Sequence, residues 1–131
     1  MRDDQKRMLE KNTLLILDKV DKDMFLYVRE SFLQLMLREN PDIDILFSTT
    51  GGEVGPGLDI YDLLRLYPGK KTGKVYGLAA SMGAVLLQVC EKRMCARHSR
   101  VLVHHIYRNE VSLDDLRSNK LLGKLREDME E

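Results

Sequence analysis

A serine and a group of histidines stand in settings that suit acyl transfer. Ser81 lies in the run Ala79-Ala80-Ser81-Met82-Gly83, between a strand-like and a helix-like segment. Small residues two before and two after a serine permit the sharp strand-to-helix turn called a nucleophile elbow. A serine there would sit over a helix N-terminus, which favours developing negative charge. The alternative interpretation is an ordinary helix N-cap residue.

A serine nucleophile needs a general base, because its hydroxyl is nearly unreactive at its own pKa. The chain has three histidines, His98, His104 and His105, and the last two end an apolar run at 100–106. Successive strand residues point to opposite faces, so only one of this pair would face Ser81. Each histidine is also consistent with an ordinary surface or half-buried residue.

A glycine cluster forms the second unusual junction. Gly51, Gly52, Gly55 and Gly57 fall within seven residues, with Pro56 among them, between another strand-like run and a helix-like run. Glycine suits both tight turns and places where the backbone comes close to another group. Either use is consistent with the cluster taken by itself.

The elements that would position these residues alternate along the chain. Apolar residues at Met24, Val28, Phe32 and Leu35 have helical spacing, for example, and Asn40-Pro41 would stop that helix. We predict strands at 13–17, 43–48, 74–79 and 100–106, and helices at 22–39, 58–66, 82–91 and from 112 toward 129. Such alternation predicts an α/β fold with a mainly parallel sheet, whose ligands gather beyond the carboxyl ends of the strands.

Composition narrows the classes of function. The 131 residues are 44% hydrophobic and 32% charged, which predicts one globular domain over 1–131. A formal net charge of +0 argues against nucleic acid and anionic membranes as partners, and no apolar run approaches the roughly 18 residues of a membrane span. The charged N-terminus lacks the apolar core of a secretory signal, so we expect a cytoplasmic protein. No metal-ligand spacing or cofactor motif occurs, and the two cysteines form no disulfide framework.

Several motifs in order resemble the proteolytic subunit of the Clp protease, ClpP, a serine peptidase family with a crotonase-like fold. That family has a Pro-Gly-Gly-Ser-Val turn before an Ile-Tyr-Asp helix, Ala-Ser-Met-Gly-Ala around its nucleophile, and Ser-Arg-Val-Met-Ile-His-Gln-Pro around its base. The matching segments here are Gly51-Gly52, Gly57, Ile60-Tyr61-Asp62, Ala80-Ser81-Met82-Gly83-Ala84 and Ser99-Arg100-Val101. The resemblance covers roughly residues 9 to 106 and implies a ClpP/crotonase-like spiral of repeated β-α units with a C-terminal handle-like helix at about 112–131.

Carried over residue by residue, the resemblance implies a peptidase site. Ser81 corresponds to the nucleophile and His104 to the general base, with the backbone N–H groups of Gly52 and Met82 as the oxyanion hole. An extended polypeptide substrate is expected to add as a strand beside the segment after Gly52. The residues predicted to bind substrate are Gly51, Glu53 and Val54.

The chain also departs from the family pattern. Thr50 replaces the proline before the two glycines, and His105 follows the base, where a one-residue slip of register would make it a rival. The family's triad aspartate lies beyond its handle helix, and no position here matches its motif. Asp114, Asp115 and Asp128 are available carboxylates on a charged helix. Three alternatives follow: another carboxylate takes the place of the aspartate, the site works as a serine–histidine dyad, or the protein is nearly inactive. The last is an alternative because loss of the orienting acid commonly lowers the rate about 10⁴-fold.

The resemblance further implies a homo-oligomeric ring, supported by an apolar stripe of Leu122, Leu125 and Met129 on the handle-like helix. Relative to the family the chain is short at both ends, so coupling to an AAA+ unfoldase is doubtful without the N-terminal axial loop. The main prediction is a serine endopeptidase. The alternatives are a catalytically weak or inactive paralogue with a structural or regulatory role, a crotonase-fold acyl-thioester enzyme, and, weakest, a phosphate-binding glycine loop, which would need a Gly-Lys-Ser/Thr motif.

Overall fold

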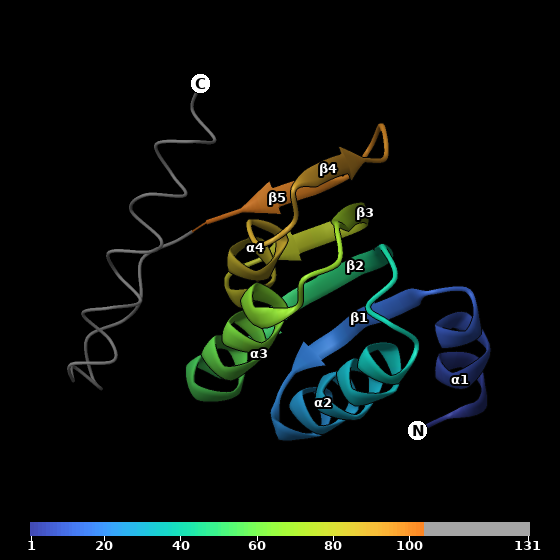
Figure 1. Cartoon of the computed structure of the whole chain (residues 1–131). Coiled ribbons are helices and arrows are strands. Elements are labelled where there is room, and N and C mark those ends of the chain that lie inside the picture. The colour runs from blue at the N-terminus through green and yellow to red at the C-terminus, as the bar shows by residue number, and fades with distance from the viewer. Residues whose placement is uncertain (104–131) are drawn as a thin grey trace.

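A parallel sheet of five strands organises residues 1–103, the part of the chain that this computed structural model describes. The strands are β1 (Thr13–Val20), β2 (Ile43–Gly52), β3 (Lys71–Ala80), β4 (Lys92–Cys95) and β5 (Arg100–Leu102). Their order is β1-β2-β3-β4 (Figure 1). The strand β5 pairs with the last residues of β3, which follow the stretch of β3 that pairs with β4. Every pairing is parallel, which confirms the predicted α/β fold with a mainly parallel sheet.

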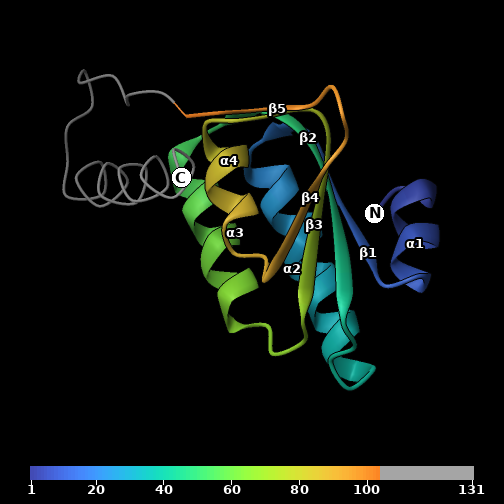
Figure 2. The ribbon, with the colours of Figure 1, turned by 90° about the horizontal axis from the view of Figure 1, so that it is seen from above.

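Helices cover the two faces of the sheet unequally. They are α1 (Asp3–Glu10), α2 (Lys22–Leu37), α3 (Val54–Leu66) and α4 (Met82–Leu87). Figure 2 shows α2, α3 and α4 on one face, with α1 on the other face beside β1. Each of α2, α3 and α4 follows a strand directly, so the turns that begin these helices share the carboxyl edge of the sheet. None of the described helices is long and apolar enough to cross a membrane.

The helix α2 shows how the sequence pattern produces the core. The four apolar residues with helical spacing, Met24, Val28, Phe32 and Leu35, are all buried. The Asp21 carboxylate accepts a hydrogen bond from the Met24 N–H at 2.9 Å and caps the start of the helix. Fully burying one such side chain stabilises the fold by about 1.5–3 kcal/mol, so this stripe fixes which face of α2 meets the sheet.

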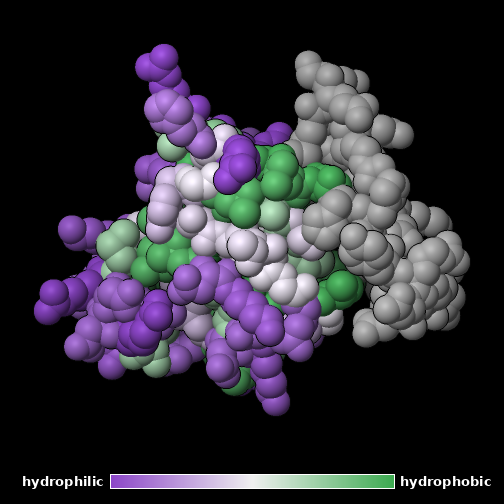
Figure 3. Space-filling model, turned by 180° about the vertical axis from the view of Figure 1, so that it is seen from behind, coloured by the Kyte–Doolittle hydropathy of each residue, from purple (hydrophilic) through white to green (hydrophobic). Residues whose placement is uncertain are grey.

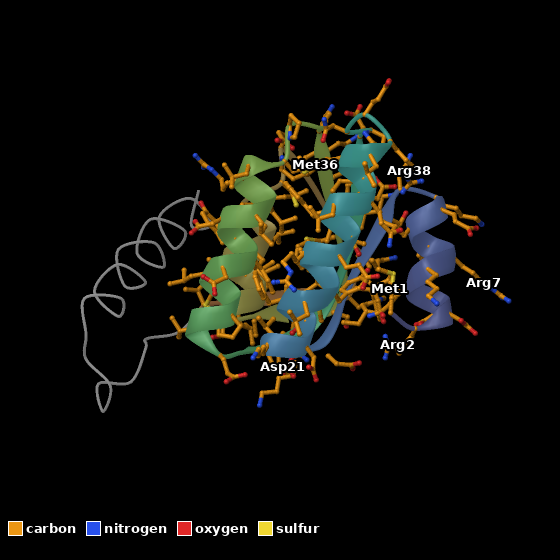
Figure 4. The ribbon with its side chains drawn as sticks, turned by 60° about the horizontal axis from the view of Figure 1, so that its bottom comes forward. Met1, Arg2, Arg7, Asp21, Met36 and Arg38 are labelled. Atoms are coloured by element: carbon orange, nitrogen blue, oxygen red, sulfur yellow. The ribbon has the colours of Figure 1, made fainter. Side chains whose placement is uncertain are left out.

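The guanidinium of Arg38, just past the end of α2, donates to the Leu9 carbonyl at 2.7 Å and so ties α2 to the end of α1 (Figure 4). Between α1, β1 and α2 lies a groove of about 640 Å³, and Met1, Arg2 and Asp21 stand beside it. Its lining includes neither the serine nor the glycine junction singled out in the sequence.

The structure differs from the sequence prediction in two added elements and in several element boundaries. Two elements were not predicted: α1, whose sequence is mostly charged, and β4, whose residues are all exposed and show no alternation. Periodicity detects only elements with a buried face, and β4 is held mainly by its ladder to β3. The helix α3 begins at Val54 rather than Leu58, and α4 ends at Leu87 rather than Glu91. Pro56 is tolerated in α3 because it lies in the first turn, where N–H groups have no intrahelical partner.

The buried Lys71, at the start of β3, connects the segment that follows α3 with the segment that follows α4. Lys71 Nζ donates to the Tyr67 and Gly69 carbonyls, at 3.0 and 3.2 Å, just past the end of α3. It also pairs with the Glu91 carboxylate at 3.1 Å. Partial burial raises the Glu91 pKa, but hydrogen bonds from the Lys71 backbone N–H and ammonium outweigh it, and the net pKa is lowered. A buried charge is tolerated only with such partners.

The carboxyl edge of the sheet is irregular where the candidate residues lie. Leu17 pairs with Ser48 and Lys19 with Gly51, so Asp18 alone opposes two residues of β2. A further shift of register occurs between β2 and β3, where Phe47 pairs with Val75 and Thr49 with Ala79. Four of the seven positive φ angles among the described residues lie here, at Asp18 (70°), Gly51 (94°), Gly77 (69°) and Ser81 (54°); the other three are in the loops that precede β1 and β2. Such backbone persists only where surrounding contacts hold it, and it clusters at functional sites.

Candidate active site

Ser81 occupies a sharp turn between β3 and α4. Its φ of 54° and ψ of −121° lie in a region that residues with a side chain rarely adopt. Two backbone hydrogen bonds hold it: the Ser81 N–H donates to the Leu102 carbonyl at 3.0 Å, and the Ser81 carbonyl accepts from the Val85 N–H at 3.2 Å. The backbone therefore has the form of the nucleophile elbow that the small residues around Ser81 predict.

The hydroxyl of Ser81 is not used as a helix cap. Ser81 holds the N-cap position of α4, yet its side chain makes no capping hydrogen bond. The ordinary N-cap interpretation requires that bond. Its absence from the described contacts removes the simplest structural role for this serine. The side chain is partly exposed at the sheet edge, where a ligand could approach it.

Gly51 brings the end of β2 directly against this turn. A Cβ on Gly51 would lie 2.7 Å from the Ala80 carbonyl oxygen, 2.8 Å from Ser81 Cβ and 3.1 Å from the Met82 nitrogen. Its φ of 94° also favours glycine. The glycine junction and the serine junction, thirty residues apart in the sequence, thus form one site.

The other three glycines of the cluster differ in whether their missing side chain lets another group come close. A Cβ on Gly52 would lie 2.1 Å from the Val20 carbonyl oxygen, so β2 passes tightly against the end of β1. Gly57 lies in α3, and a Cβ there would lie 2.4 Å from Met82 Cε, which packs across it. A Cβ on Gly55 would meet nothing within 4 Å. Three of the four glycines therefore permit close approach of the backbone.

The extended segment predicted after Gly52 is short. Glu53 is extended, with φ −76° and ψ 136°, but it is the N-cap of α3, and Val54 is the first helical residue. Of the two residues after Gly52, only Glu53 is therefore available in an extended conformation for pairing with a substrate strand. Binding of substrate by Gly51, Glu53 and Val54 stays a prediction.

The strand β5 leads toward the predicted base. Leu78, Ala79 and Ala80 pair in parallel with Arg100, Val101 and Leu102, and the Leu102 carbonyl receives the Ser81 N–H. The strands β3 and β5, which end at Ala80 and at Leu102, therefore run side by side (Figure 1). His104, the rival His105, the carboxylates Asp114, Asp115 and Asp128, and the handle-like helix at 112–131 all lie outside the described residues.

The cysteines do not rival Ser81 as nucleophiles at this edge. Cys90 is buried, and desolvation, followed by the nearby Glu91 charge, raises the pKa of its thiol to about 12. A thiol with that pKa is almost entirely protonated at neutral pH and is inert. Cys95 is exposed but lies on β4, which pairs with the opposite end of β3 from Ser81.

No group of three His, Cys, Asp or Glu side chains that could hold a metal ion occurs within residues 1–103.

Thr49 is a residue of this site that the sequence analysis did not single out. It is buried, its hydroxyl accepts from the Gly51 N–H at 3.0 Å, and the same hydroxyl donates to the Asp18 carbonyl. A hydroxyl residue two positions before a glycine turn is a signal that could have found it, because such side chains bond the backbone two residues on.

Comparisons with known proteins agree with this geometry. A family model described as Clp protease matches residues 1–130. A curated relative, ATP-dependent Clp protease proteolytic subunit 3 of Rhodococcus jostii (strain RHA1), is 36% identical over 104 residues, which cover 75% of this chain and 50% of that protein. The chain thus spans about half the length of the curated relative that it matches.

Proposed function

The chain belongs to the Clp protease family, and from that premise we propose that it is a serine endopeptidase acting on extended polypeptides. The observation that carries the proposal is the Ser81 turn: a serine with positive φ, a hydroxyl not engaged in capping, and Gly51 packed against it. An ordinary helix start needs none of these features. A nucleophile elbow needs the sharp turn and the small neighbours.

The proposed reaction has two stages. Ser81 Oγ attacks the carbonyl carbon of a peptide bond while His104 takes the hydroxyl proton. The C–N bond then breaks, the proton passes to the leaving amine, and an acyl ester remains on Ser81. In the second stage a water molecule, deprotonated by the same histidine, cleaves the ester and restores the serine.

The N–H groups of Gly52 and Met82 are proposed as donors to the oxyanion. Support comes from the close approach of Gly51 to the start of α4: a Cβ on Gly51 would lie 3.1 Å from the Met82 nitrogen, so the two peptide segments are neighbours. The Glu53 N–H, next along the chain, donates to the Val20 carbonyl at 2.8 Å, which fixes this end of β2 against β1. Removing one such donor commonly lowers the rate about 10²–10³-fold.

The test is covalent labelling with an alkyl fluorophosphonate. We expect the probe to label the chain and Ser81→Ala to abolish labelling. Ser99→Ala, the same change at a partly exposed serine whose hydroxyl donates to the Ala96 carbonyl at 2.7 Å, should leave labelling unchanged. Ser81→Ala keeps a Cβ at the same φ, so its thermal stability should match that of the wild type. Absence of labelling, under conditions that label an authentic Clp peptidase, would contradict the proposal and favour the alternative of an inactive paralogue.

We further infer self-association, as the resemblance implies. The relative in Rhodococcus jostii is named as an ATP-dependent proteolytic subunit, which extends the proposal to an ATP-dependent partner. Large apolar side chains remain exposed on the described surface, among them Leu33, Leu37, Leu66, Tyr76, Met94 and Leu102. Figure 3 shows hydrophobic surface bordered by hydrophilic side chains on one face. Sedimentation velocity should show a species larger than a monomer, and a monomer at all concentrations used for labelling would contradict the inference.

A further inference from the structure

Thr49 connects the three strand ends that surround Ser81. It lies on β2, three residues before Gly52, and only 3% of its surface is exposed. It pairs with Ala79 of β3, immediately after a shift of register between the two strands. Its neighbours therefore include the end of β1, the glycine turn of β2 and the segment of β3 that leads into the elbow.

The hydroxyl of Thr49 is fully engaged by the backbone. Thr49 Oγ1 accepts a hydrogen bond from the Gly51 N–H at 3.0 Å and donates one to the Asp18 carbonyl. Asp18 has a φ of 70° and forms the irregular point of β1, while Gly51 has a φ of 94°. One hydroxyl thus ties together two strained turns, and both depend on it because a buried backbone group without a partner is unfavourable.

The methyl group of Thr49 reaches the helix that carries the elbow. A Cβ on Gly83 would lie 2.4 Å from Thr49 Cγ2, and its next two nearest atoms, at 3.6 and 3.8 Å, also belong to Thr49. The methyl therefore rests on the backbone of α4 two residues after Ser81. Thr49 touches both segments that hold the proposed oxyanion donors, Gly51-Gly52 on one side and Met82-Gly83 on the other.

We propose that Thr49 is a positioning residue, whose hydroxyl and methyl together set the separation between the Gly52 and Met82 N–H groups. This inference rests on the proposed function, since it assigns no separate chemistry to Thr49. Catalytic donors must keep their geometry within a fraction of an ångström, and a misplacement of 1 Å can lower the rate about 10²-fold. A threonine supplies both a bond that fixes the glycine turn and a contact that fixes α4.

The first test separates the hydroxyl from the methyl. Thr49→Val keeps a methyl and removes the hydroxyl, and we expect the maximal rate of fluorophosphonate labelling to fall about 10–100-fold with little change in the probe's apparent affinity. Thr49→Ser keeps the hydroxyl but loses the methyl contact with α4, so its rate should fall by a smaller factor than that of Thr49→Val. A matched control is Thr13→Val, which removes a hydroxyl bonded to the Lys11 carbonyl at 3.1 Å far from the site. Thr13→Val should leave the rate unchanged.

A size swap tests the methyl even if Thr49→Val does not fold. Gly83→Ala introduces a Cβ against Thr49 Cγ2 and should lower the labelling rate. Adding Thr49→Ser removes that methyl, leaves only ordinary contacts for the new Cβ, and should restore the rate. A loss that Thr49→Ser does not reverse would overturn the proposal.

Labelling of the wild type distinguishes a failure of this inference from a failure of the proposed function. If the wild type is not labelled, the peptidase proposal itself has failed. If the wild type is labelled and a folded Thr49→Val variant is labelled at the wild-type rate, Thr49 does not position the donors and this inference is wrong.

Discussion

Asp21 and Ser81 occupy the same position in the fold, the N-cap of a helix that follows a parallel strand, yet the two residues are held in different ways. Asp21 is extended, with φ −143° and ψ −171°, and its carboxylate caps the Met24 N–H at 2.9 Å. Ser81 has φ 54° and ψ −121°, and its hydroxyl caps nothing in the described structure. The first helix start stabilises itself locally.

The second helix start depends on its neighbours. The Ser81 turn is stabilised by β5 through Leu102, by Gly51, whose missing side chain leaves room for it, and by Thr49 through Gly83. A strained serine held by contacts from two other strands is expected where the side chain must be presented to a ligand. The comparison therefore separates a residue that builds a helix from one that the fold presents for chemistry.

Among the variants that test this difference between the two helix starts, Gly51→Ala should have the largest effect on stability and labelling. The new Cβ would meet Ala80 and Ser81 within 2.8 Å at a φ of 94°, so we expect a loss of unfolding free energy of about 2 kcal/mol or more. Labelling of Ser81 should fall as the elbow shifts. Urea unfolding and fluorophosphonate labelling check both parts, and a stable variant labelled normally would show that the elbow does not depend on this contact.

Gly55→Ala is the matched control for that change. It lies four residues along in the first turn of α3, where an added Cβ meets nothing within 4 Å. Its unfolding free energy should be unchanged or higher by up to about 1 kcal/mol, because alanine favours helix more than glycine. Its labelling should equal that of the wild type.

A smaller effect is expected from Asp21→Ala, which removes the side-chain cap at the start of α2. Loss of the cap should lower the free energy of unfolding by about 1 kcal/mol, and Asp21→Asn should recover most of it, since both residues cap well. Labelling of Ser81 should not change in either variant once the protein is folded. A large loss of labelling in Asp21→Ala would show that the two helix starts are coupled.

The sequence was sufficient to predict elements that bury a face. The periodic residues Met24, Val28, Phe32 and Leu35 predicted α2, and the alternation of strands and helices predicted the parallel sheet. The start of α3 was missed because Gly55, Pro56 and Gly57 are typical of turns. Gly57 is there for another reason: its bare Cα receives the Met82 side chain, a contact between residues far apart in the sequence.

The candidate site was predictable in type but not in arrangement. The small residues around Ser81 predicted a sharp turn, and the structure has one. The sequence did not indicate that Gly51 would touch the Ser81 turn, that Gly52 would pass against Val20, or that Thr49 would bond to both Asp18 and Gly51. Each of these contacts depends on the register between strands, which periodicity alone does not specify.

The most direct test of the account is the position of the fluorophosphonate adduct on the chain. We predict a single adduct per chain by intact mass, and peptide mapping that places it on the hydroxyl of Ser81, with the same result in Asp21→Ala. An adduct on another serine, or an unmodified chain under conditions that label an authentic Clp peptidase, would contradict the assignment of Ser81 as the nucleophile.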